Sequence, residues 1–151
     1  MHTLSNKEKK ALVGLLPKAY SFDKKDVFHL MQISKENKLF LLLKNSQPFL
    51  IQKEGHFFPH LLSFPDDSYA SVFIDNGALL HILKGAALMR PGIVEIRGTF
   101  TKGDVLAVRD MTKGKAVALG LALCTSEEMA VLEKGKVVQI YHYFNDEFYS
   151  K

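Results

Sequence analysis

The stretch SVFIDNGALLHILKGAALMRPGIVEIR, residues 71–97, decides the fold. It opens with a short apolar run at 71–74, which is typical of a buried strand. Asp75 then stands where a helix N-cap is expected, because its carboxylate can accept a free backbone amide of the first turn. The apolar residues that follow predict one buried helix face, and Gly85 stands where a glycine commonly ends a helix.

The chain beyond this stretch predicts short strands joined by tight turns. The apolar runs lie at 93–96, 105–109, 116–122 and 137–144, with turn signals such as Lys102-Gly103-Asp104 and Lys113-Gly114-Lys115 between them. Several short strands with regular turns favour a small β-barrel. Thr125-Ser126-Glu127-Glu128 is a capping box, so we expect one short helix there, ending near Gly135.

The first 70 residues predict a different unit. A capping box, Ser5-Asn6-Lys7-Glu8, begins a helix that Pro17 is expected to end. Residues 38–44 form a buried-strand run, Asn45-Ser46 turns the chain, and residues 48–52 run back, which predicts a β-hairpin. Residues 28–33 fit a strand or a short helix. A turn is expected at Phe64-Pro65-Asp66-Asp67, so we predict an α+β fold with an N-terminal α+β domain over 1–70 and a second domain over 71–151.

Composition excludes several classes of protein. The chain has 151 residues, of which 47% are hydrophobic and 24% charged, values typical of a globular protein. It contains no run of 18 apolar residues, so we expect no membrane span, and its basic N-terminus lacks the apolar core of a secretory signal. One cysteine, Cys124, excludes an intrachain disulfide and favours a reducing, cytoplasmic location.

The net charge of +4 permits nucleic-acid binding without requiring it. Residues 1–70 hold ten lysines against seven acidic residues, a net +3, and neither half carries a polybasic tail. Any RNA contact would therefore come from a few placed side chains.

No pattern of catalytic or metal-binding residues emerges. Cys124 follows Leu121-Ala122-Leu123, which favours a buried, inert thiol. His56 and His60 have metal-ligand spacing, but Pro59 lies between them and no third ligand motif follows. We find no phosphate-binding loop or dinucleotide-binding loop, and we expect no enzyme activity, no metal and no cofactor.

The decisive stretch resembles a known module. Asp75-Asn76-Gly77-Ala78, Leu83-Lys84-Gly85-Ala86 and Met89-Arg90-Pro91-Gly92-Ile93 together are similar to the opening of a PUA domain, the RNA-binding module named after pseudouridine synthase and archaeosine transglycosylase. Residues 102–108, 118–120 and 135–138 fit its later strands. Gly55-His56-Phe57-Phe58-Pro59 and the ending at 140–146 resemble the malignant-T-cell-amplified-sequence family and its archaeal relatives.

That resemblance implies a function. Members of the family join an N-terminal α+β domain to a C-terminal PUA domain, a small mixed β-barrel with short helices. Its eukaryotic members bind the small ribosomal subunit and tRNA, with density-regulated protein as partner. We therefore expect a non-catalytic RNA-binding protein that binds tRNA or the small ribosomal subunit in translation initiation, reinitiation or recycling, with room for a protein partner.

The resemblance also places the RNA contact beside the first helix of the PUA domain. Lys84-Gly85-Ala86 would combine a cation with a glycine that lets the backbone approach a phosphate, although Gly85 also fits a plain helix cap. Arginine can fork onto a phosphate or a guanine edge, or simply face solvent. Aromatic rings of the last strand offer stacking faces, although alternation buries one or two of them. The predicted RNA-binding residues are Lys84, Gly85, Ala86, Arg90, Arg97, His142 and Tyr143.

Two alternatives stay open. The chain could be an accessory subunit that presents RNA to a separate tRNA or rRNA modification enzyme, because a fold alone does not fix a function. It could also be a protein-interaction module without an RNA role, anchored by the pair Phe57-Phe58 if both rings face solvent.

Overall fold

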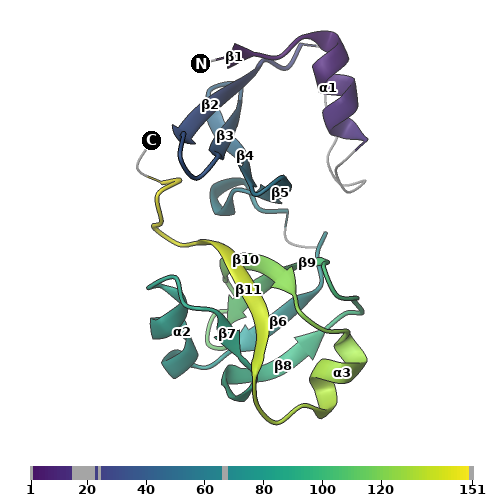
Figure 1. Ribbon diagram of the computed structural model, residues 1–151, viewed down its shortest axis with the longest axis vertical. Helices are drawn as coiled ribbons and strands as arrows, with labels where there is room; N and C mark the ends of the chain where they lie inside the picture. The colour runs from purple at the N-terminus through teal and green to yellow at the C-terminus, as the bar shows by residue number, and fades with distance from the viewer. Residues whose placement is uncertain (1, 15–22, 24, 66–67, 150–151) are drawn as a thin grey trace. The chain divides into compact units, whose positions relative to one another are not determined.

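The computed structural model describes residues 2–14, 23, 25–65 and 68–149. The chain divides into two compact units, the first extending to Ser68 and the second beginning at Tyr69 (Figure 1). Each unit has its own sheet and its own core. No helix in the described ranges is long and apolar enough to cross a bilayer.

The first unit is an antiparallel five-stranded meander with one helix. Its strands are hydrogen-bonded in chain order, β1 to β5. The core of this sheet includes Phe28, Leu42 and Leu50, each no more than 2% exposed. The elements are β1 (His2–Thr3), α1 (Asn6–Val13), β2 (Phe28–Ser34), β3 (Leu39–Lys44), β4 (Gln47–Lys53), β5 (His56–Pro59) and a 3-10 turn, η1 (Leu61–Ser63).

Local signals explain most of this unit. The Oγ atom of Ser5 accepts the amide of Glu8 at 3.2 Å, and Oε1 of Glu8 accepts the amide of Ser5 at 3.0 Å, so the predicted capping box is confirmed. The hairpin is confirmed as β3 and β4, where Asn45 and Ser46 have φ angles of 50° and 69°. Two positive φ values make a turn whose twist matches that of the strands.

The structure also decides two points in the first unit, the state of residues 28–33 and the end of the first helix. Residues 28–33, which fitted two structures, belong to strand β2. Helix α1 ends at Val13, before Pro17. Pro17 lies outside the described residues, as does the Asp66-Asp67 part of the predicted turn.

The second unit holds a six-stranded mixed sheet with the order β7-β11-β10-β9-β6-β8. Strands β6 and β9 are parallel, and the other pairs are antiparallel. Its core includes Val72, Leu106, Leu119 and Met129, all fully buried. The elements are β6 (Ser71–Ile74), α2 (Asn76–Ile82), β7 (Leu88–Met89), a 3-10 turn η2 (Arg90–Gly92), β8 (Ile93–Arg97), β9 (Val105–Asp110), β10 (Ala116–Ala122), α3 (Ser126–Val131) and β11 (Lys136–Tyr143).

The two helices of this unit begin where their caps predict. Asp75 Oδ1 accepts the amide of Ala78 at 2.8 Å and starts α2. Thr125 starts α3, but this helix ends at Val131, not near Gly135 as predicted. Val131 is 81% exposed, so the chain has already left the core and no buried contact supports another turn.

Candidate nucleic-acid interface

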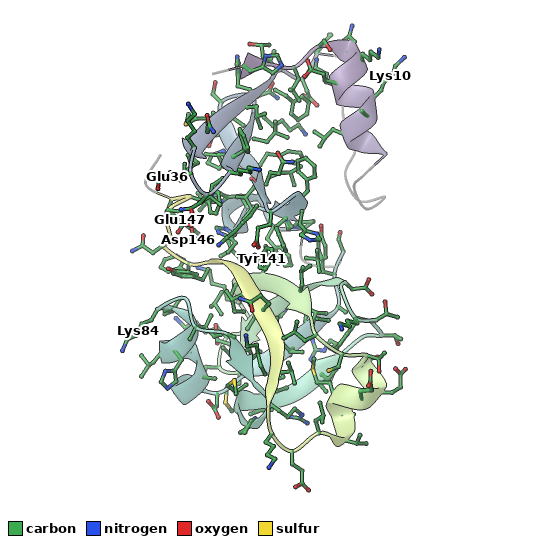
Figure 2. All side chains as sticks on the ribbon, viewed as in Figure 1. Lys10, Glu36, Lys84, Tyr141, Asp146 and Glu147 are labelled. Atoms are coloured by element: carbon green, nitrogen blue, oxygen red, sulfur yellow. The ribbon has the colours of Figure 1, made fainter. Side chains whose placement is uncertain are left out.

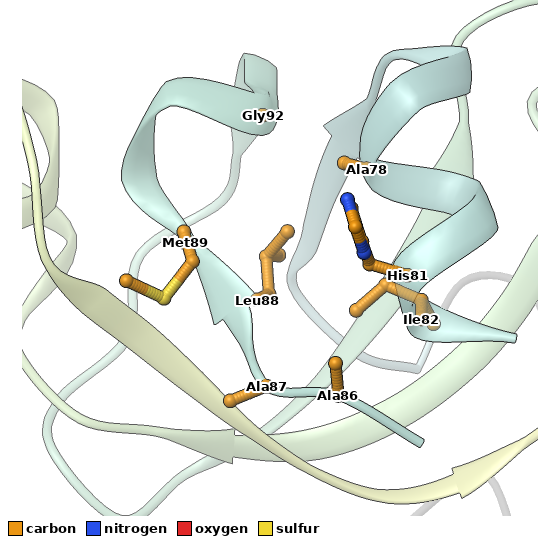
Figure 3. A pocket seen from close by; sticks show the side chains of 8 residues that line it. All are labelled: Ala78, His81, Ile82, Ala86, Ala87, Leu88, Met89 and Gly92. Atoms are coloured by element: carbon orange, nitrogen blue, oxygen red, sulfur yellow. The ribbon is translucent and has the colours of Figure 1, made fainter. Parts of the chain in front are cut away.

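A pocket of about 440 Å³ lies between α2 and β7 in the second unit (Figure 3). Helix α2 forms one wall, and the segment through β7 and η2 forms the other. Most of the lining is apolar, and His81 is the titratable side chain among the eight lining residues. These residues are Ala78, His81, Ile82, Ala86, Ala87, Leu88, Met89 and Gly92.

The close approach of the two walls depends on Gly92. The backbone carbonyl of Gly92 accepts the amide of Asp75 at 3.0 Å, which fixes η2 against the start of α2. A Cβ atom added to Gly92 would lie 2.5 Å from the Cβ atom of Ala78, far inside van der Waals contact. Two small residues, Ala78 and Gly92, therefore set the width of the pocket.

The Lys84-Gly85-Ala86 turn lies at the C-terminal end of α2, and all three residues are exposed. Gly85 has a φ of +89°, a backbone conformation that glycine adopts without strain. A Cβ atom there would lie 3.4 Å from the ring of Tyr143, so the turn passes closely over that ring. Lys84 projects away from the unit (Figure 2). The structure thus brings the Lys84-Gly85-Ala86 segment together with Tyr143, which was predicted separately from the last strand.

Tyr143 presents a neutral phenol beside this turn. Partial burial raises the pKa of its hydroxyl, and the carboxylates of Glu147 and Asp146 raise the pKa further. The hydroxyl therefore keeps its proton at neutral pH and can both donate and accept a hydrogen bond.

Arg90 has a different role from the predicted one. Its Nε atom donates to the carbonyl of Met129 in α3 at 2.7 Å, and Nη1 donates to the carbonyl of Ile93 at 3.2 Å. The side chain is half-buried. Its guanidinium therefore joins η2 to α3. Arg90 makes a structural contact within the unit, whereas the sequence predicted a guanidinium that binds a phosphate.

Arg97 lies on β8, away from the Lys84 turn. Its Nη2 atom lies 2.6 Å from Oε2 of Glu95, and its guanidinium lies 4.5 Å above the ring of Phe73. Strand β8 and the pocket strand β7 are opposite edges of the sheet order. Arg97 is exposed, but its charge is already compensated by Glu95.

His142 is fully buried, so its predicted role as a stacking surface for RNA is wrong. Its Nδ1 atom lies 2.8 Å from Oδ2 of Asp146, whose carboxylate also accepts the amides of Tyr143 and Phe148. The imidazole packs against the rings of Phe148 and Tyr149. Alternation along β11 buried His142 and left Tyr143 half-buried, packed against the core of the second unit.

The sequence also singled out a thiol, a histidine and a pair of phenylalanines, and the structure shows each of them packed within the protein. Cys124 packs against the core of the second unit, and burial raises the pKa of its thiol above the ordinary value. His60 is buried, and its Nδ1 atom accepts the amide of Leu62 at 3.1 Å. Phe58 is fully buried and Phe57 half-buried, so this pair does not form the exposed anchor of a protein-interaction module.

Sequence reasoning missed the pocket itself. The run Ala86-Ala87-Leu88-Met89 reads as an apolar strand, and nothing in its composition shows that it faces α2 across a cavity. Ala78 and Gly92 stand fourteen positions apart, so no local pattern indicates the close approach that the structure shows between them.

Comparison with known proteins places this geometry in a family. The PUA domain pattern matches residues 70–144, and the pattern of a domain of unknown function (DUF1947) matches residues 1–64. Translation machinery-associated protein 20 of Schizosaccharomyces pombe is 32% identical over 124 residues, which is 78% of this chain and 68% of that protein. The malignant T-cell-amplified sequence 1 homolog of Drosophila melanogaster is 28% identical over 128 residues, which is 82% of this chain and 70% of that protein.

A solved structure extends the match to the whole described fold. The crystal structure of a hypothetical protein from Pyrococcus horikoshii OT3 has a TM-score of 0.85 and 27% identity, covering 99% of this chain and 97% of that chain. The resemblance inferred from the motifs is therefore confirmed. The chain belongs to the family of PUA-domain proteins that includes translation machinery-associated protein 20 and the malignant T-cell-amplified sequence 1 homolog.

Proposed function

We propose that this protein binds structured RNA of the translation machinery, either tRNA or the small ribosomal subunit, in initiation, reinitiation or recycling. One observation carries the proposal. The exposed Lys84-Gly85-Ala86 turn lies beside an apolar pocket and the ring of Tyr143, in a chain whose relatives are named for association with that machinery.

The geometry supports binding to a phosphate and its neighbouring nucleoside. Lys84 is an exposed ammonium on a flexible stem, which suits a phosphate oxygen. Gly85 gives this turn its positive φ and lets it pass close over the ring of Tyr143, where a Cβ atom would lie 3.4 Å from the ring. The apolar walls at Ala78 and Leu88 suit the flat face of a base or ribose, while His81 supplies a polar contact in the lining.

The same site gives no basis for a reaction. Of the eight residues that line the pocket, His81 is the one with a titratable side chain. A general acid–base pair needs a second group within hydrogen-bond reach of the reacting atoms. We therefore propose that the protein acts by binding and holding RNA.

The experiment is a comparison of three RNA ligands. Binding of the full chain to tRNA, to isolated small ribosomal subunits and to an RNA duplex of matched length is measured at two salt concentrations. We expect tighter binding to tRNA or small subunits than to the duplex, because RNA shape selects among ligands. The salt dependence should be modest, because few phosphates are contacted. Equal binding to all three ligands, or none, would refute the proposal.

Two variants locate the contact. Lys84→Gln should weaken binding and lower the slope of log K against log salt by about one unit. Ala86→Glu places a carboxylate on the same turn and should weaken binding at least about tenfold by repelling phosphate. Lys134→Gln is the matched control, because Lys134 is exposed on the same unit in the loop after α3. An Lys84→Gln protein that behaves like the Lys134→Gln control would remove this turn from the interface.

A further inference from the structure

We propose that Phe144, flanked by Lys113 and Lys115, forms a second RNA contact that stacks one unpaired base of a single-stranded segment. This inference rests on the proposed RNA-binding function and extends it to a surface outside the α2 pocket. The residues lie on the β9–β10 turn and just after β11 in the second unit.

Phe144 is an exposed ring in a prepared position. It is 46% exposed, although phenylalanine is usually buried. Its amide donates to the carbonyl of Val117 at 2.9 Å, which fixes the backbone beneath the ring. The ring of Tyr149 lies edge-on to it, with centroids 5.5 Å apart. The ring of Tyr149 in turn stacks on the buried imidazole of His142, with centroids 5.7 Å apart. The exposed ring of Phe144 is therefore supported by two packed rings.

Two lysines border this ring. The Nζ atom of Lys115 lies 5.6 Å from the centroid of the Phe144 ring, and Lys113 is exposed two residues earlier on the same turn. Within the described residues, neither lysine forms an ion pair with a carboxylate. The turn itself is held rigidly, because Nη1 of Arg109 donates to the carbonyl of Gly114 at 3.0 Å. Two uncompensated ammonium groups are therefore present on this turn, and that of Lys115 lies over one face of the exposed Phe144 ring.

This combination fits nucleic acid better than protein. Lysine is depleted at the centre of protein–protein interfaces, where an aromatic anchor would lie. Aromatic rings with neighbouring cations are the usual elements of single-strand binding, since every base has a face that can stack. A duplex keeps its bases stacked on one another, so its bases cannot reach this ring.

The position also continues the proposed site. Tyr143, whose ring lies under Gly85, and Phe144, whose ring lies by Lys115, are consecutive residues. An RNA strand that contacts both the Lys84-Gly85-Ala86 turn and Phe144 would therefore have to cross the end of β11, because successive side chains of a strand point to opposite faces.

The test uses the absence of tryptophan from the sequence. Phe144→Trp introduces a single tryptophan, whose emission is excited apart from that of the five tyrosines, and it keeps the stacking face. We expect quenching of its emission by a ten-nucleotide single-stranded oligoadenylate, and wild-type affinity for that RNA. A blunt RNA duplex of ten base pairs should leave the emission unchanged. Emission that stays constant while the oligoadenylate binds would overturn the inference.

Affinity measurements on the full chain give a second readout. Phe144→Ala should weaken binding of the oligoadenylate by roughly 5- to 150-fold, the range for one lost base stack, with no change in the salt slope. Lys115→Gln and Lys113→Gln should each lower the salt slope by about 0.7. Val131→Ala and Lys134→Gln serve as controls, because both residues are exposed on the same unit.

The outcomes separate the two proposals. Wild-type binding to tRNA or small subunits together with unchanged binding by Phe144→Ala would overturn the second contact and leave the proposed function standing. No RNA binding by the wild-type chain would overturn both. A Phe144→Ala variant that binds RNA normally but loses a protein partner would overturn the inference in favour of a protein-binding surface.

Discussion

The contact between Gly92 and Ala78 allows a sharp test of how the pocket is built. Gly92→Ala would place a Cβ atom 2.5 Å from the Cβ atom of Ala78, whereas its other neighbours lie at 3.7 Å or more. Ordinary carbon contacts are about 3.5–4.0 Å, so η2 and α2 must separate by about 1 Å or more. Overpacking of this kind costs about 1–3 kcal/mol of unfolding free energy.

The second half of the test removes the atom that causes the clash. Ala78→Gly alone should cost about 1 kcal/mol, because glycine is a poor helix residue in α2. In the double variant the clash is gone, so the total loss of unfolding free energy should stay near about 1 kcal/mol. It should not reach roughly 2–4 kcal/mol, which is the sum of the losses in the two single variants. The predicted coupling between the two positions is therefore about 1–3 kcal/mol.

Urea denaturation followed by far-ultraviolet circular dichroism measures all four proteins. Thermal melting gives a check, since 1 kcal/mol corresponds to about 2–4 °C in a chain of this size. If the two single effects add in the double variant, the atoms do not meet and the close approach of η2 to α2 is wrong.

Three further predictions concern stability and titration. Asp146→Ala should lower the unfolding free energy by about 3–5 kcal/mol, because Asp146 is buried and its carboxylate bonds His142 and two amides; the exposed Glu147→Ala is the control in urea denaturation. The cap at Glu128 should weaken in acid. Hydrogen bonds from the backbone and side chain of Thr125 lower the pKa of Glu128 below 4.5, so its contribution to stability is complete above pH 4.5 and is lost as the pH falls through the lowered value. Glu128→Gln should therefore reduce the loss of stability between about pH 5 and pH 3, and an unchanged pH profile would contradict the capping role. Tyr149 should ionise late, because burial, followed by the charge of Asp146, raises its pKa to about 12. The stability linked to this phenol is present below pH 10 and is lost as the pH rises toward 12, and Tyr149→Phe should remove the last step from an absorbance titration of tyrosinate.

Sequence reasoning worked best where a structure is decided by a few neighbouring residues. Both capping boxes and the Asn45-Ser46 turn involve groups at most three residues apart, and the structure confirms them. Residues 28–33 could not be assigned because their strand state depends on pairing with β3, where Phe28 pairs with Lys44, and on pairing with β1, where His2 pairs with Leu30. Helix α3 ended early for a similar reason, since exposure of Val131 follows from the shape of the whole unit.

The candidate site shows the same difference between features decided by neighbouring residues and features decided by distant ones. The glycine and lysine of the Lys84-Gly85-Ala86 turn were predicted from a local pattern, and the structure places them on the surface beside Tyr143. The failures at Arg90 and His142 have another cause. Residue type reveals what a side chain can bind, but a partner distant in the sequence, Met129 for Arg90, decides whether that capacity is already used.

The contacts of the arginines bear on what kind of RNA interface the protein can form. The sequence has three, and each is engaged within the second unit: Arg90 with backbone carbonyls, Arg97 with Glu95, and Arg109 with Ser71 and Gly114. The cations that remain on the proposed surfaces are lysines, at positions 84, 113 and 115. Lysine is a point charge without the planar fork that reads a guanine edge, so it contacts phosphate and leaves base identity unread. Recognition built on these residues would depend on RNA shape, unpaired bases and salt.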